Sequence, residues 1–149
     1  MNSQQTSRGT LATRCLLGSL VLIFLPLITQ GAILSPSEIV NLWIQVFPKD
    51  LKAAAALTTK DLRKGKNENQ WVEAHQKSVA DSKFHYLGGK VISETIDHDA
   101  AVVVFQAHFT SVLGEQIGEE VYHLKKQLDG GWLIDAVEMK QDHILGHEL

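Results

Sequence analysis

The chain has 149 residues, of which 44% are hydrophobic and 21% charged, a composition typical of one globular domain. Two of its 14 basic residues, Arg8 and Arg14, lie in the first 31 residues, which contain no acidic residue. The remainder has 12 basic against 17 acidic residues, a formal charge of −5, which excludes nucleic acid as an expected partner because such domains usually present a basic face. Cys15 is the only cysteine, so the rest of the chain can form no internal disulfide and offers no thiol nucleophile or thiolate metal cluster.

Residues 1–31 have the layout of a secretory signal peptide. Two arginines precede an uncharged apolar run that begins at Cys15, and small residues follow this run. An uncleaved anchor is the alternative, since the run approaches the roughly 20 apolar residues that span a bilayer. We favour cleavage after Gly31 or Ala32, because Pro26 and a later glutamine interrupt the run. We therefore expect an exported protein, periplasmic or secreted. The alternative is a single-pass membrane-anchored domain outside the cytoplasm, and only this alternative involves a membrane.

A first helix is predicted to begin at Ser35. Pro36 suits the first helical position, and Glu38 is placed to complete a capping box with Ser35. The helix ends before Pro48, and its apolar stripe follows helical spacing through Ile39, Leu42, Trp43, Val46 and Phe47.

Two further helices are predicted before the sheet. Asp50 can cap a short second helix, and the pair Asn67 and Gln70 opens a third helix that runs to about Ala80. The inward stripe of the third helix consists of Trp71, Ala74, His75, Ser78 and Val79. We expect His75 to be a boundary histidine whose ring bonds to the backbone.

Residues 83–140 are predicted to form four antiparallel strands joined by short turns. In the clearest strand, over 100–112, every second residue is apolar, as in a sheet with one buried face. Gly88 and Gly89 predict a bulge that bends the first strand. If the third strand, over 117–128, pairs in an odd register, the buried face also carries Glu120, Tyr122, Leu124 and Leu128. His108 and His123 would then lie together on the opposite face.

The turn into the last strand, over 132–140, is predicted at Asp129, Gly130 and Gly131. A two-residue loop would put Leu133, Asp135, Val137 and Met139 on the core face. A three-residue loop would put Trp132, Ile134, Ala136 and Glu138 there and leave Asp135 outside. We favour the second arrangement, because a buried carboxylate is costly and Trp132 with Ile134 buries more apolar surface.

The order of helices and a curled sheet, together with the closing stretch over 128–137 (LDGGWLIDAV), resembles the nuclear-transport-factor-two-like family, a cystatin-like α+β cone. The resemblance covers about residues 35–140. It implies three helices packed on a strongly bent sheet, with a pocket between the layers. With the four strands predicted above, we expect one α+β domain over 32–142 followed by a tail over 143–149. Members include ketosteroid isomerase, scytalone dehydratase, limonene epoxide hydrolase and polyketide cyclases, and also exported or membrane-tethered domains without catalytic activity. No catalytic motif of those enzymes can be matched residue by residue to this sequence.

The pocket that this resemblance implies has a mainly aromatic expected lining. By composition, its residues are Trp43, Trp71, His75, Phe105, Tyr122, and Glu138 or Asp135. The same residues also suit a filled or merely ligand-sized core, which is the interpretation we favour. An apolar cavity with a few polar groups suits a small apolar ligand, so we expect an exported module that binds a small molecule or a protein partner. The alternative is an isomerase, dehydratase or cyclase with His75 or Asp135 as the base and Tyr122 stabilising an oxyanion.

We expect no cofactor. His143 and His147 would share a face if the tail were helical, a spacing that can bind zinc, but the tail lies at the chain end and the HExxH pattern is absent, so we assign no metal site. The outer face of the sheet suits a homodimer contact through Val102, Val104, Ile117 and Val121.

Overall fold

The computed structural model describes residues 33–144, which form three helices followed by four strands. The helices are α1 (Pro36–Val46), α2 (Leu51–Ala56) and α3 (Glu68–Ser82). The strands are β1 (His85–Asp97), β2 (Ala100–Ser111), β3 (Gly114–Lys126) and β4 (Trp132–Ile144), and they form one antiparallel sheet in the order β1-β2-β3-β4. The predicted α+β architecture is confirmed. Within the described range, no helix has the length and hydropathy needed to span a bilayer.

The helices begin where their capping residues predict. The Ser35 hydroxyl accepts a hydrogen bond from the Glu38 amide, and the Glu38 carboxylate accepts one from the Ser35 amide, which completes the capping box. Asn67 and Gln70 form the same reciprocal pair at α3, and Asp50 caps α2 through the Ala53 amide.

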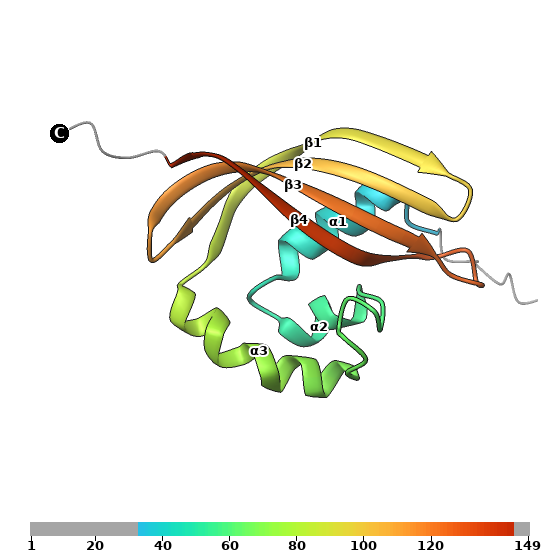
Figure 1. The fold of residues 1–149 in the computed structure, drawn as a ribbon, viewed down its shortest axis with the longest axis horizontal. Coiled ribbons are helices and arrows are strands. Elements are labelled where there is room, and N and C mark those ends of the chain that lie inside the picture. The colour runs from blue at the N-terminus through green and yellow to red at the C-terminus, as the bar shows by residue number, and fades with distance from the viewer. Residues whose placement is uncertain (1–32, 145–149) are drawn as a thin grey trace, which may run out of the picture. The chain divides into compact units, whose positions relative to one another are not determined.

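All three helices lie on one face of the sheet, with α1 next to it (Figure 1). Along α1, Ile39, Val40 and Trp43 are buried against the inner face of the sheet. That face contributes Ala101, Val103, Phe105, Ala107, Phe109, Tyr122, Leu124, Trp132 and Ile134 to the same core. Helix α3 buries little beyond Trp71, and Ala74 and Ser78 of its predicted stripe are exposed.

The odd register between β2 and β3 is as predicted. Val103 pairs with Tyr122 and Phe105 pairs with Glu120, so all four residues share the inner face. The prediction that Leu128 lies on the buried face is wrong, because β3 ends at Lys126 and Leu128 is fully exposed in the following loop. His108 and His123 share the outer face, but they do not lie together.

Two irregularities bend β1. The pairing with β2 shifts between Tyr86 and Gly88, as the paired glycines predicted, and again between Val91 and Ser93. A side chain at Gly89 would have no room, because its Cβ would lie 2.4 Å from both the Gln106 carbonyl oxygen and the Phe105 ring. Gly89 therefore allows the Phe105 ring to pack across the bent strand.

Both predicted loop lengths for the last hairpin, two and three residues, are wrong. Lys126 pairs with Trp132, and the residues between them form the loop. Trp132 and Ile134 are buried, as in the favoured arrangement, and Asp135 stays outside the core. The pairing then shifts at Asp135, so Val137 faces Tyr122 on the inner side.

This bulge overturns the expectation that Glu138 faces the interior. Glu138 pairs with Val121 on the outer face, where its carboxylate lies 3.3 Å from the His123 Nε2 atom. The strand also continues past residue 140, so His143 lies in β4 opposite Ile117 and not on a helix.

Candidate functional site

A cavity of about 350 Å³ lies between α1, α3 and the inner face of the sheet. Its wall includes an aromatic series in which the ring centroids of Trp43 and Phe47 are 4.9 Å apart and those of Phe84 and Tyr86 are 4.8 Å apart. Val79 of α3 and Val137 and Met139 of β4 complete a mostly apolar lining. The volume is within the range of small-molecule sites, which begins near 300 Å³.

One carboxyl group, that of Glu120, lines this apolar cavity. The Glu120 side chain is 1% exposed. The Tyr86 hydroxyl lies 2.9 Å from Glu120 Oε1, the Tyr122 hydroxyl donates to Oε2 at 2.5 Å, and the two hydroxyl oxygens are 3.3 Å apart. Tyr86 lines the cavity with Glu120, whereas Tyr122 is fully buried. Tyr122 therefore positions the carboxyl group.

The register explains how side chains from two strands that are not neighbours meet. Tyr86 lies opposite Phe109, and Glu120 lies opposite Phe105 of the same strand, β2. Between these two cross-strand pairs, the next inward-facing residue of β2 is Ala107. It pairs with Gly89 of β1 and with Gly118 of β3, so this row across the sheet contains only small residues. This row leaves space on the inner face for the Tyr86 side chain to reach Glu120.

Burial controls the protonation of this cluster. It raises the pKa of Glu120, and the hydrogen bonds from Tyr122 and Tyr86 oppose this shift only in part. Burial, with the nearby Glu120 charge, also raises the pKa of Tyr86, and burial raises that of Tyr122. Both tyrosines therefore stay protonated, and a neutral Glu120 can donate a hydrogen bond to a ligand in the cavity.

The three residues of the predicted catalytic set do not meet. His75 of α3 stacks on Trp71 with ring centroids 4.5 Å apart, and its Nδ1 atom lies 2.7 Å from the Trp71 carbonyl oxygen. This is the expected boundary histidine with a backbone partner. Tyr122 lies in the buried cluster, and Asp135 lies outside the core.

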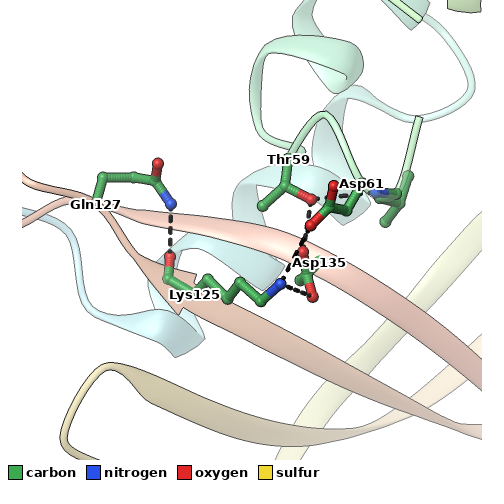
Figure 2. Close-up of polar contacts among 6 residues, drawn as sticks. Thr59, Asp61, Lys125, Gln127 and Asp135 are labelled. Atoms are coloured by element: carbon green, nitrogen blue, oxygen red, sulfur yellow. Dashed lines mark hydrogen bonds and ion pairs between the residues drawn. The ribbon is translucent and has the colours of Figure 1, made fainter. Parts of the chain in front are cut away.

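Asp135 belongs to a polar network that joins the sheet to the segment after α2 (Figure 2). The Thr59 hydroxyl donates to Asp135 Oδ1 at 2.7 Å, and Lys125 Nζ lies 2.9 Å from Oδ2 and 3.4 Å from Asp61. Burial pushes the pKa of Asp135 upward, but the hydrogen bonds from Lys125 and Thr59 outweigh it and hold the pKa below its usual value. Backbone bonds from Thr59 to Ile134 and from Ile134 to Leu57 strengthen the same junction. The network has a structural role.

Of the predicted lining residues, Trp43 lines this cavity. Trp71 and Phe105 are core residues, Tyr122 lies behind Glu120, and Glu138 faces away. The sequence had already placed Glu120 on the inner face, but its role was missed because its neighbour Tyr86 comes from a strand two positions away. An acidic residue within an otherwise apolar strand face was the available signal.

A metal site finds no support in the described part of the chain, where no group of three or more His, Cys, Asp or Glu side chains could hold an ion. Of the predicted pair, His147 lies outside the described residues, as does the side chain of His143. His108 and His123 each have an acidic neighbour instead, Glu115 and Glu138 respectively.

No protein-family model matches the sequence, and comparison with curated proteins finds no significant match. Solved structures do match. A candidate calcium/calmodulin-dependent protein kinase type II association domain from Thiobacillus denitrificans has a TM-score of 0.57 at 8% identity, over 75% of this chain and 98% of its own. A nuclear transport factor 2-like superfamily protein from Salmonella enterica has a TM-score of 0.55 at 19% identity, over 75% of this chain and 92% of its own.

A domain of unknown function with a cystatin-like fold, from Nostoc punctiforme, matches with a TM-score of 0.55 at 13% identity, over 73% of this chain and 76% of its own. At these identities the similarity concerns the fold. The chain has the nuclear-transport-factor-two-like, or cystatin-like, fold, as its sequence indicated.

Proposed function

We propose that this domain binds a small, mostly apolar molecule in the cavity between α1, α3 and the sheet. The observation that carries the proposal is the Glu120 carboxyl group, which is almost fully buried yet lines the cavity beside the Tyr86 hydroxyl. The apolar wall supplies most of the contact area, and these two groups fix the orientation of one polar group of the ligand.

The chemistry of the cavity selects a neutral ligand with one hydroxyl or carbonyl group. A raised pKa keeps Glu120 protonated over a wider pH range, so it can donate to a carbonyl and accept from a hydroxyl. An anionic ligand is disfavoured, because an apolar surrounding solvates its charge poorly and Glu120 becomes a like charge when it ionises. The predicted set of His75, Asp135 and Tyr122 does not converge on this cavity, so catalysis by that set is not part of the proposal.

The test compares 2-naphthol with naphthalene, two probes that differ by one hydroxyl, by calorimetric titration of the purified chain. We expect 2-naphthol to bind about tenfold more tightly, the effect of one buried hydrogen bond. Glu120→Leu should abolish this preference while naphthalene still binds. Glu138→Leu, the same change on the outer face, should leave the preference intact. Equal affinity for both probes in the unaltered chain, or no binding of either, would overturn the proposal.

We also propose that the domain acts outside the cytoplasm, because residues 1–31 have the layout of a leader, and that it forms a homodimer through the outer sheet face. Val102 and Val104 of that face are partly exposed and Ile117 is 37% exposed, whereas Val121, the fourth residue predicted for this contact, is buried. Native mass spectrometry of the protein expressed with residues 1–31 tests both points, since its mass shows whether these residues are removed and its stoichiometry shows whether it is a dimer.

A further inference from the structure

A second cavity, of about 580 Å³, is lined by the start of α2 and the segment before it, by α3, and by the residues that lead into β1. Its apolar lining residues include Leu51, Val72 and Phe84. Val79 and Phe84 line both cavities, so the two cavities are neighbours. The Glu120 cluster does not line this second cavity, which therefore has a different chemistry.

Basic side chains dominate the polar part of its lining. Lys49, Lys52 and Lys83 line the cavity together with His85, and Asp50 is the acidic residue among the lining residues. The Asp50 carboxylate already accepts the Ala53 amide as the cap of α2. Among the side chains described over residues 33–140, none of the three lysines has a carboxylate within 4 Å. The lining thus carries more positive than negative charge, although the domain as a whole has a formal charge of −5.

Lys83 occupies a backbone position that normally favours glycine. It is the C-cap of α3 and has a left-handed conformation, with φ of 52°. A lysine there is less favourable for the backbone than glycine, although its charge also interacts well with the end of the helix. In this position the Lys83 side chain lines the cavity, together with the lysines that flank Asp50.

We propose that this second cavity binds an anionic amphiphile, a small molecule with one anionic head group and one short aliphatic chain. The lysines attract the anionic head group, and the apolar lining residues contact the aliphatic chain of the ligand. The site is separate from the proposed function, because the Glu120 cavity disfavours an anion and this cavity favours one. The charge of the ligand therefore distinguishes the two sites.

The test uses three probes that share a ten-carbon aliphatic chain, namely decanoate, decanol and decyltrimethylammonium. Each is titrated into the purified full-length protein by calorimetry. Decanoate should bind at least tenfold more tightly than either other probe, and its affinity should fall as salt is raised, since ions screen exposed charges. The double variant Lys49→Gln/Lys83→Gln should weaken decanoate binding at least fivefold without changing the circular dichroism spectrum. Lys90→Gln, which removes one exposed charge on the outer face, should leave the affinity within twofold.

Equal affinity for decanoate and decanol, or decanoate binding that the double variant leaves unchanged, would overturn the proposal. Either result would show that these lysines do not select an anionic head group. Absence of decanoate binding in the unaltered chain would overturn it as well. None of these outcomes affects the naphthol test, so the two sites can fail independently.

Discussion

Glu120 and Tyr86 come from strands that are not adjacent, β3 and β1, yet the Tyr86 hydroxyl lies 2.9 Å from one carboxyl oxygen of Glu120 and 3.0 Å from the other. The contact crosses β2 at its row of small residues. The two residues form a polar pair in the lining of the otherwise apolar cavity. The bulge in β1 is part of the geometry that brings Tyr86 to Glu120.

Stability should depend on the protonation of Glu120. Its pKa is raised in the folded state above the ordinary value of 4.5, so the folded protein holds this proton more tightly than the unfolded chain. The contribution of protonated Glu120 to the free energy of unfolding is fully present below pH 4.5. It is lost as the pH rises through the pKa of Glu120 in the folded state. Urea unfolding across this range should show that Glu120→Gln removes this part of the pH dependence. An identical pH profile for both proteins would contradict the assignment.

The Asp135 network should give the opposite pH dependence. The pKa of Asp135 is lowered below 3.8, so its stabilisation is present above that pH and is lost as the pH falls through the lowered pKa. Asp135→Asn should cost about 1 kcal/mol at neutral pH, because it removes charged acceptors from Thr59 and Lys125. Urea unfolding measures this cost. Asp97→Asn, at a carboxylate that is 86% exposed, is the matched control and should have little effect.

Gly89 should be far less replaceable than Gly88. Both have nearly the same φ, 156° at Gly89 and 157° at Gly88, a region that residues with a side chain rarely adopt, so alanine is strained at both positions. A Cβ added at Gly89 would overlap Gln106 and Phe105, whereas a Cβ added at Gly88 would meet no atom within 4 Å. Gly89→Ala should therefore destabilise the protein by about 2 kcal/mol more than Gly88→Ala, as measured by thermal unfolding. Equal effects would contradict the close packing of the Phe105 ring.

The proposed homodimer can be tested on the outer face of the sheet. Val104→Glu should convert the dimer to a monomer, because a charge would be buried at the contact. Leu128→Glu, at a fully exposed loop residue, is the control and should leave the dimer intact. Sedimentation velocity reports both results, and an unaltered chain that is monomeric at micromolar concentration would rule the dimer out.

Capping pairs and strand alternation predicted much of this fold, because each depends on interactions between residues that are close in the sequence. Ser35 with Glu38 and Asn67 with Gln70 satisfy backbone groups within one helical turn, so their spacing was sufficient to place two helix starts. The alternation in β2 likewise depends on the geometry of one strand.

Two features of the site could not be predicted in this way. The bulge at Asp135 follows from long-range bonds between Ile134 and the segment after α2, and apolar residues on both sides of Asp135 allow either alternation. The bond between Tyr86 and Glu120 depends on two pairings and on the bulge in β1. The sequence indicated that a bulge occurs there, but not which side chain it directs toward Glu120.

Glu120 is a buried carboxyl group that lines a cavity, and the proposed ligand binding depends on this placement. The most direct test of this placement is a ¹³C NMR titration of the Glu120 side-chain carboxyl, with and without 2-naphthol. We expect a pKa above 4.5 that changes when the probe enters, because the hydroxyl group of the probe forms a new hydrogen bond with the carboxyl group. A pKa at or below 4.5 that 2-naphthol does not change would contradict both the burial of this carboxyl group and its role in the site.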